Sequence, residues 1–130
     1  MKIMIVDDER VSRIKMQQIL KGYGECHAVE NGLTAIKSFT EALLDEKPFD
    51  LITLDISMPD LGGPEVLESI RKLESKNGIT VENRSKILMV TAHSDYPTVV
   101  ASIEAGCNDY IKKPFSEERV LLKLNKMNLA

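Results

Sequence analysis

Short apolar runs alternate along the chain with segments in which apolar residues recur every three or four positions. A short apolar run between polar residues is typical of a strand buried on both faces, whereas the longer spacing is typical of an amphipathic helix. The pattern predicts five strands, at Ile3–Val6, Cys26–Val29, Phe49–Leu54, Lys86–Val90 and Asp109–Lys112.

Helical spacing follows each of these runs. The apolar positions predict helices over Val11–Leu20, Ala35–Leu43, Val66–Leu73, Val99–Ile103 and Val120–Leu124. Gly22 or Gly24 is expected to end the first helix in the left-handed conformation, and Gly106 is expected to close the fourth. Pro64 suits the first turn of the third helix, and Ser116 can cap the last.

Five repeats of strand then helix predict an α/β fold, in which a doubly wound parallel sheet carries helices on both faces. A chain of 130 residues fits one domain over 1–130. In such sheets ligands bind beyond the carboxyl ends of the strands. The polar stretch Ser75–Ser85 lies after a helix and before a strand, so we expect it at the opposite edge, as a solvated loop or a partner contact.

Charge and composition limit the classes of molecule that the domain is expected to bind. With 17 Lys and Arg against 20 Asp and Glu, the net charge is -3, which gives no electrostatic case for direct nucleic-acid binding and favours protein partners. The few apolar residues before Asp7 do not form a signal peptide, and no stretch has membrane-spanning length, so we expect a cytoplasmic protein. Cys26 and Cys107 are isolated, which argues against a zinc or redox site.

Chemically distinctive residues stand at the ends of the predicted strands. Asp7 and Asp8 follow the first run, Asp55 follows the third, Thr91 follows the fourth and Lys113 follows the fifth. Carboxylates held close together and half out of water repel one another, and a hard cation would relieve this repulsion. The sequence therefore predicts a binding site for a hard cation at this edge of the sheet.

In their order along the chain these residues match a known set of motifs. The set comprises Asp7-Asp8, Asp55 with Met58-Pro59 and Gly63, Thr91-Ala92, and Tyr110 before Lys113-Pro114-Phe115. From Lys2 to about Met127 the chain resembles a response-regulator receiver domain of two-component signalling, similar to the chemotaxis regulators. The resemblance implies a flavodoxin-like fold with five helices and strand order 2-1-3-4-5. That order puts Cys26 and Cys107 near opposite sheet edges, too far apart for a disulfide.

The resemblance also implies a role for each acid. Asp55 would accept a phosphoryl group in a Mg²⁺-dependent reaction from a sensor histidine kinase or a phosphotransfer protein. Asp8 and Asp55 would ligate Mg²⁺ directly, together with the backbone carbonyl of Ser57, and Asp7 would act through a bound water. Phosphoryl transfer mainly requires in-line positioning and neutralised charge, which these residue types supply.

The remaining motif residues would carry the signal. Lys113 would pair with Asp55 and the phosphoryl oxygens, and it is preferred over Lys112 because successive strand residues point to opposite faces. The Thr91 hydroxyl would bond the phosphoryl group, and Tyr110 would then rotate inward. This switch would alter the surface of the fourth helix, fifth strand and fifth helix, to which a downstream protein binds.

Two further positions bear on how long the signal lasts. The resemblance implies that Ser57 and His93 influence the access of water to the phosphoryl group, although a lone histidine on such a loop is also typical of a solvated rim.

Two other functions would use some of the same residue types. A haloacid-dehalogenase-type Mg²⁺-dependent phosphatase also uses an aspartate nucleophile after a buried strand, but it requires a second acid two residues later, where this chain has Ser57. A receiver-like interaction module that is never phosphorylated typically lacks the nucleophile or one of the paired acids, all of which are present here. We therefore expect a signalling phosphoacceptor that promotes only its own phosphorylation and dephosphorylation, and not an enzyme.

Overall fold

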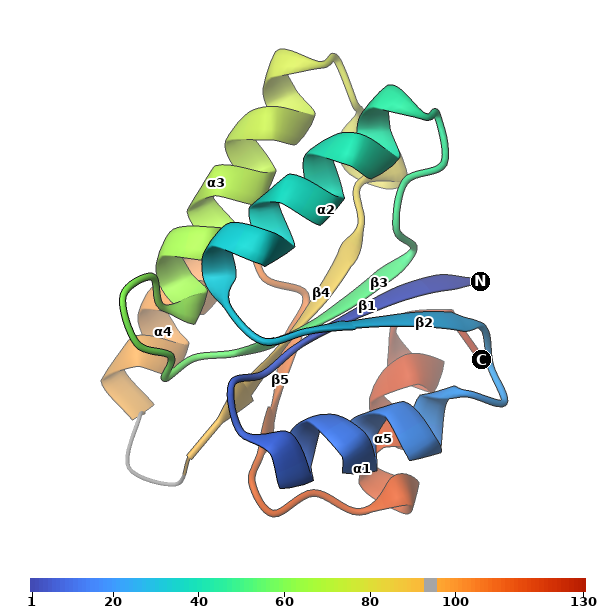
Figure 1. The fold of residues 1–130 in the computed structure, drawn as a ribbon, viewed down its shortest axis with the longest axis vertical. Coiled ribbons are helices and arrows are strands. Elements are labelled where there is room, and N and C mark those ends of the chain that lie inside the picture. Colours follow the sequence, from blue (N-terminus) through green and yellow to red (C-terminus); the bar gives the residue numbers. More distant parts are fainter. Residues whose placement is uncertain (93–95) are drawn as a thin grey trace.

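A computed structural model of the chain describes residues 1–92 and 96–130. Strands and helices alternate, with one additional turn of 3₁₀ helix, η1, before β4 (Figure 1). The elements are β1 (Lys2–Val6), α1 (Arg10–Leu20), β2 (Glu25–Val29), α2 (Gly32–Leu44), β3 (Leu51–Asp55), α3 (Gly63–Lys76), η1 (Val81–Asn83), β4 (Lys86–Thr91), α4 (Tyr96–Glu104), β5 (Asp109–Lys112) and α5 (Glu117–Lys126).

The strands form one parallel sheet in the order β2-β1-β3-β4-β5, as the family resemblance implied. The order reverses between β1 and β3, the position at which ligands bind in doubly wound sheets. Pairing aligns Val6 with Leu54 and Asp55 with Val90. The carboxyl ends of the central strands are therefore level with one another, and the side chains that follow them gather at one edge.

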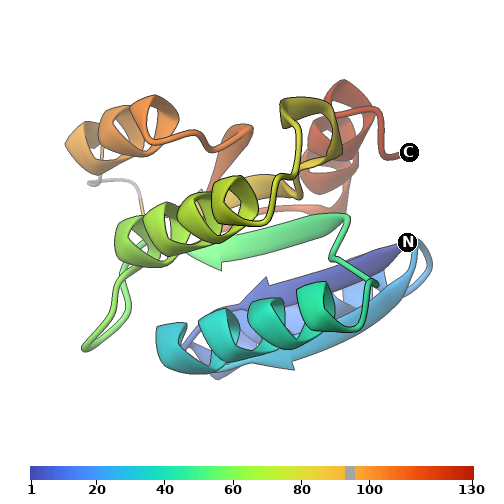
Figure 2. The ribbon, with the colours of Figure 1, turned by 90° about the horizontal axis from the view of Figure 1, so that it is seen from above.

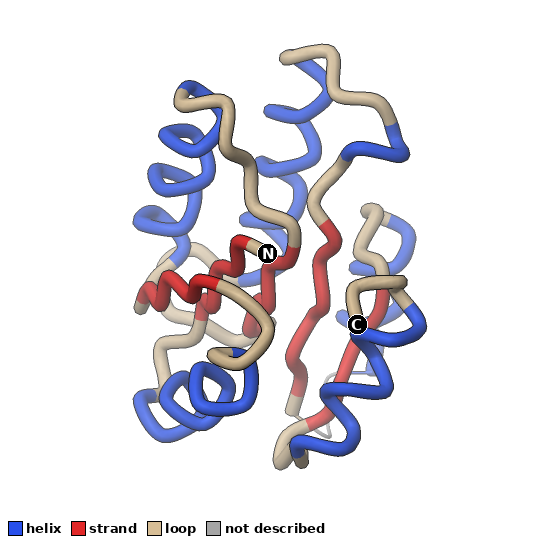
Figure 3. Tube along the Cα trace, turned by 90° about the vertical axis from the view of Figure 1, so that its right-hand side faces the viewer, coloured by secondary structure: helices blue, strands red, loops and turns tan. Residues whose placement is uncertain are grey.

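Two apolar cores lie on opposite faces of the sheet. Alternate residues of the strands point to each face, so that Met4 packs with α2 and α3 while Ile3 and Ile5 pack with α1 and α5. Figures 1 and 2 show α2 and α3 side by side over one face, and Figure 3 shows the strands in the interior with the helices around them. The fold class predicted from the apolar pattern is confirmed.

Three of the four helix boundaries whose cause was predicted from the sequence have that cause. The Ser116 side chain accepts a hydrogen bond from the Arg119 backbone N–H at the start of α5, and Pro64 stands in the first turn of α3. Gly106 closes α4 with a φ of 103°, in the region that favours glycine. Gly63 brings α3 against the end of β3, because a Cβ there would lie 2.4 Å from the Asp55 carbonyl oxygen.

The predicted glycine cap of α1 is wrong. The helix ends at Leu20 with Lys21 in the right-handed conformation, and neither Gly22 nor Gly24 has a positive φ. Gly24 is instead needed for close approach, since a Cβ on it would lie 2.1 Å from the Met1 carbonyl oxygen. The position of a glycine after a helix is the same in both cases, so the sequence does not distinguish a left-handed helix cap from a close approach of two backbone segments.

The stretch Ser75–Ser85 lies at the amino end of the sheet, as expected, but it is not simply a solvated loop. Its first residues belong to α3, and it contains η1. Ser85 is buried, with its backbone N–H donating to Glu74 Oε2 at 2.8 Å and its hydroxyl donating to the Phe49 carbonyl at 2.6 Å. Within the described part of the chain, no helix combines the length and apolar character needed to cross a membrane.

Candidate functional site

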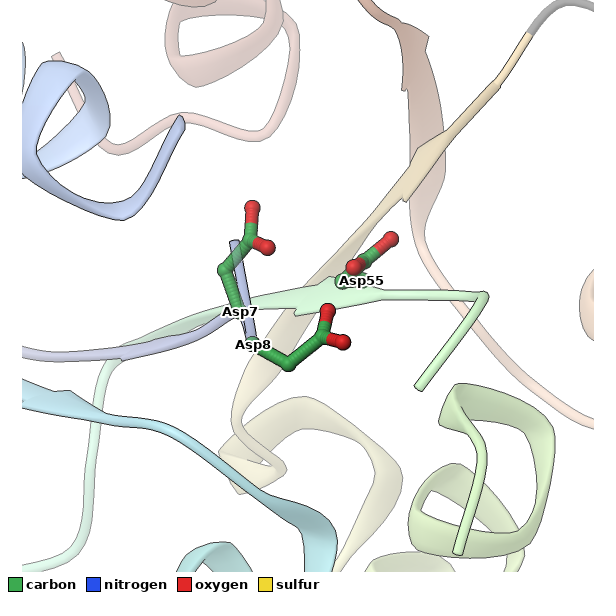
Figure 4. A group of neighbouring side chains, drawn as sticks. All are labelled: Asp7, Asp8 and Asp55. Carbon is green, nitrogen blue, oxygen red and sulfur yellow. The ribbon is translucent and has the colours of Figure 1, made fainter. Parts of the chain in front are cut away.

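Three aspartates meet at the carboxyl ends of β1 and β3 (Figure 4). One carboxylate oxygen from each of Asp7, Asp8 and Asp55 lies within 4.8 Å of the others. Asp7 and Asp55 are each only 4% exposed, whereas Asp8 is exposed to solvent. The strand register causes this arrangement, because pairing of Val6 with Leu54 places the next residues, Asp7 and Asp55, side by side.

The cation of Lys113 lies against this cluster. Its Nζ is 3.2 Å from Asp7 Oδ2 and 3.5 Å from Asp55 Oδ2. The neighbouring Lys112 is exposed, in agreement with the prediction that the two lysines point to opposite faces of β5. The backbone N–H of Lys113 donates to the Thr91 carbonyl at 2.8 Å, and the Lys113-Pro114 peptide bond is cis. Continued pairing with β4 thus holds the lysine beside the acids.

Burial of the nucleophile candidate changes its acidity. Removal from water, and then the charge of Asp7, raise the pKa of Asp55 to about 7, although Lys113 opposes the shift. Burial alone lowers the pKa of Lys113, but the carboxylates of Asp55 and Asp7 outweigh it, so the pKa is raised and the lysine stays protonated. A divalent cation beside Asp55 would therefore favour its ionised form.

Backbone N–H groups and a cavity adjoin the three acids. The Ser57 N–H is 3.3 Å from Asp55 Oδ1, and the Glu9 N–H donates to Asp7 Oδ1 at 2.9 Å. A cavity of about 270 Å³ opens above them, and it is lined by Asp8, Glu9, Asp55, Ser57, Ala92 and Lys113. The donor set consists of carboxylate oxygens at an open cavity, which fits a Mg²⁺ ion that keeps several waters.

Thr91 ends β4 beside this cluster and is almost fully buried, at 1% exposure. Its hydroxyl donates to the Ala92 carbonyl at 2.9 Å. Among the described residues the Thr91 side chain makes no hydrogen bond to the three carboxylates, so the predicted bond to a phosphoryl group requires the hydroxyl to turn.

Tyr110 lies one strand away and is half-buried. It pairs in register with Met89, two residues before Thr91, so the three side chains share a face of the sheet. Its ring packs against the core under α2 and α3, and Lys123 Nζ lies 5.2 Å from the ring centroid. Lys123 also pairs with Asp109 at 2.9 Å. The switch candidates are therefore neighbours, which the strand order implied.

Two residues near the site were missed from the sequence. The Glu9 carboxylate lies 3.9 Å from Lys113 Nζ, and Arg13 Nη1 donates to the Asp7 carbonyl at 3.0 Å. Arg13 also reaches Glu30 at 3.3 Å and so links the end of β1 to the end of β2. The spacing of four residues from Glu9 to Arg13, at the start of a helix after the paired acids, is the signal that could have indicated them.

One predicted site residue, His93, lies outside the described residues. Cys26 and Cys107 are both half-buried free thiols. Burial raises the pKa of Cys26, and burial followed by the charge of Asp109 raises that of Cys107. A raised pKa makes a thiol less reactive at neutral pH.

Comparison with known proteins places this geometry in a family. Residues 3–125 match the response regulator receiver domain family. The chemotaxis protein CheY of Bacillus subtilis is 33% identical over 96% of this chain and 95% of its own length, and that of Listeria monocytogenes is 35% identical over 97% of each. The crystal structure of the receiver domain of the Arabidopsis thaliana histidine kinase CKI1 complexed with Mg²⁺ matches with a TM-score of 0.81, at 28% identity over 94% of this chain and 89% of that one. The chain therefore belongs to the response-regulator receiver domain family, as a chemotaxis-regulator-like member.

Proposed function

We propose that Asp55 accepts a phosphoryl group from the phosphohistidine of a sensor histidine kinase or a phosphotransfer protein. One observation carries the proposal: a buried carboxylate lies within reach of two further acids and of a lysine ammonium, at the floor of an open cavity. An Asp55 carboxylate oxygen would attack phosphorus as the bond to the imidazole nitrogen breaks. The products are an aspartyl phosphate and free histidine.

Each neighbour of Asp55 has a task in this transfer. Lys113, 3.5 Å from Asp55 Oδ2, would neutralise charge on the phosphoryl oxygens and follow the phosphoryl group as it arrives. The Thr91 hydroxyl would exchange its bond to the Ala92 carbonyl for one to a phosphoryl oxygen. Ser57 lines the cavity and, with His93, would influence how easily water reaches the acyl phosphate.

The acidic residues would hold Mg²⁺. Asp8, Asp55 and the backbone carbonyl of Ser57 would bind the ion directly, and Asp7 through a water. When bound, the ion supplies positive charge that offsets the charge on phosphorus-bound oxygens. Asp8 is exposed to solvent whereas Asp7 and Asp55 are buried, so the site that would hold the ion is open to water and to an incoming phosphoryl group on the side of Asp8.

The phosphorylated domain would change its affinity for a downstream protein through α4, β5 and α5. Tyr96, Val100 and Ile103 recur at helical spacing along α4 and are 67%, 40% and 52% exposed. A cavity of about 460 Å³ between Tyr110 and Lys123 lies on β5 and α5. This surface combines exposed apolar side chains with the proposed switch residue, as a phosphorylation-dependent docking face requires.

The test is covalent labelling. The protein should gain one phosphoryl group from acetyl phosphate in the presence of Mg²⁺, acid-stable and base-labile, detected as a mass increase by mass spectrometry. Asp55→Asn should abolish it. Asp60→Asn is the matched control, because Asp60 is exposed on the following loop and asparagine tolerates its positive φ. A label that persists in Asp55→Asn would contradict the assignment.

Labelling with acetyl phosphate, together with an assay of phosphate release from phosphomonoesters, separates the alternatives. A haloacid-dehalogenase-type phosphatase would release phosphate from phosphomonoesters over many turnovers without a lasting adduct, and the exposed Ser57 stands where its second acid is required. A receiver-like module that is never phosphorylated would take no label at all. Retention of all three acids and of Lys113 in one cluster supports the phosphoacceptor.

A further inference from the structure

A second charged cluster lies at the amino end of the sheet, opposite the three aspartates. It surrounds a cavity of about 190 Å³ lined by Arg71, Val81, Arg84, Lys86, Gly106 and Asn108. These residues come from α3, η1 and the residue after it, β4, and the turn between α4 and β5. Figure 2 shows this turn beside the segment that joins α3 to β4. Among the residues that the structure describes, no carboxylate lines the cavity.

Arg71 forms one wall and is fully engaged by the protein. Its guanidinium donates to the Gly106 carbonyl at 3.0 Å, the Ser85 carbonyl at 2.9 Å and Asn108 Oδ1 at 3.0 Å. It also pairs with the buried carboxylate of Glu74 at 2.6 Å, which offsets its charge. Arg71 therefore holds the cavity's shape and leaves the binding of a ligand to other groups.

Arg84 and Lys86 are not engaged in this way. Within the described part of the chain, the Arg84 side chain makes one hydrogen bond, from Nη2 to Ser75 Oγ at 3.1 Å, and its Nε–H is buried without a partner. Among the described residues, Lys86 forms no ion pair with a carboxylate. Asn108 Oδ1 accepts from both Arg71 and the Ile87 backbone N–H, which leaves the Asn108 amide group as a further donor.

A buried donor without an acceptor is unfavourable, and two uncompensated cations attract negative charge. Guanidinium groups bind the oxygens of phosphate and carboxylate in pairs. The cavity is smaller than the roughly 300 Å³ at which pockets for drug-sized ligands begin. We propose that this cavity binds a small oxyanion of the phosphate class, held by Arg84 and Lys86, independently of phosphorylation at Asp55.

The test is titration with orthophosphate and, separately, with methyl phosphate, followed by ¹H–¹⁵N NMR in EDTA at constant ionic strength. Saturable shifts are expected at the Lys86, Gly106 and Asn108 amides and at the Arg84 Nε–H. Equal affinities would identify the inorganic ion as sufficient, and tighter binding of methyl phosphate would identify a phosphomonoester. Arg84→Gln and Lys86→Gln should each weaken binding by about tenfold, the typical effect of one charge-assisted hydrogen bond.

Lys37→Gln is the matched control, because Lys37 is exposed on α2 and its loss changes the net charge equally. It should bind phosphate as tightly as the natural protein, and so should Asp55→Asn. Two results would overturn the proposal. One is the absence of saturable shifts at the amino end of the sheet; the other is binding that is lost in Asp55→Asn and kept in both cavity variants, which would place the anion at the aspartates.

Discussion

At the scale of single residues, Asp55 combines burial with a neighbouring like charge, and this makes its ionisation costly. The carboxylate is 4% exposed, and its pKa is raised to about 7, by burial first and by Asp7 second. An unfolded chain would release the same proton at about pH 4. The folded protein thus binds one more proton than the unfolded chain between these two values, and the free energy of unfolding falls as the pH rises through this range.

Asp55→Asn should remove that dependence. Between pH 5 and pH 8 the free energy of unfolding should fall by about 2 to 3 kcal/mol less in the variant than in the natural protein. The reason is that the variant lacks the carboxyl group whose folded-state pKa lies about two units above pH 5. Urea unfolding in EDTA at the two pH values measures the difference. Asp60→Asn, which removes an exposed acid, should keep the natural slope. Equal slopes in all three proteins would show that Asp55 ionises normally in the fold.

Residue roles were predictable from the sequence to different degrees. The positions of Asp7, Asp8, Asp55 and Lys113 could be predicted because each follows a buried strand, and parallel strand ends meet at one edge. The contacts of Arg13 could not be predicted, since its hydrogen bond to the Asp7 carbonyl depends on the direction in which a long side chain leaves α1. Gly24 was misread because close approach to Met1 is a tertiary contact.

At the scale of elements, the ends of β1 and β3 bring three carboxylates close together, and a bound cation should stabilise the folded protein. Millimolar Mg²⁺ should raise the melting temperature, and at about a hundredfold excess over Kd it should add roughly 2.7 kcal/mol. Asp8→Ala should largely remove the response, although loss of a repelling acid can itself stabilise the metal-free protein. Asp60→Asn should respond as the natural protein does. An unchanged melting curve of the natural protein with Mg²⁺ would refute the acidic site.

The cap of α5 is a second element-scale feature. Ser116 accepts from the Arg119 backbone N–H at 3.2 Å, and Glu117 and Glu118 stand in the first turn, where negative charge is favourable. Ser116→Ala should lower the free energy of unfolding by about 1 kcal/mol, and Ser116→Asp should restore it. Urea denaturation at pH 7 measures both. An unchanged free energy of unfolding in Ser116→Ala would mean that the hydroxyl's cap bond contributes nothing.

At the scale of the whole molecule, the alternation of strand and helix was predictable because a parallel sheet buried on both faces produces apolar runs, and its covering helices produce spacings of three and four. The hydrogen-bond network around Arg71, at the amino end of the sheet, could not be predicted from the sequence. Glu74 follows Ile70 by four residues on the apolar face of α3 and is buried, where a carboxylate would not be expected from the sequence. Its pairing with Arg71 at 2.6 Å, and the bonds of Arg71 to the Ser85 and Gly106 carbonyls, tie α3 to both. Such pairing depends on tertiary distances.

The proposed signal must also cross the molecule, from Asp55 through Thr91 to Tyr110. Phosphorylation adds up to two negative charges, which should draw the Thr91 hydroxyl from the Ala92 carbonyl and open space behind it for the Tyr110 ring. A ring rotation suffices if the partner favours one rotamer, because a ligand shifts an equilibrium only through differential affinity.

The variants Thr91→Ala and Tyr110→Ala should still be phosphorylated at Asp55. Their affinity for a partner that was captured with the activated protein should be almost independent of phosphorylation. The natural protein and Tyr23→Ala, which alters an exposed tyrosine elsewhere, should gain roughly 5- to 150-fold, the usual range of coupling between sites. Calorimetric titration of phosphorylated and unphosphorylated forms measures the ratio, and a full gain in both switch variants would eliminate the route through Thr91 and Tyr110.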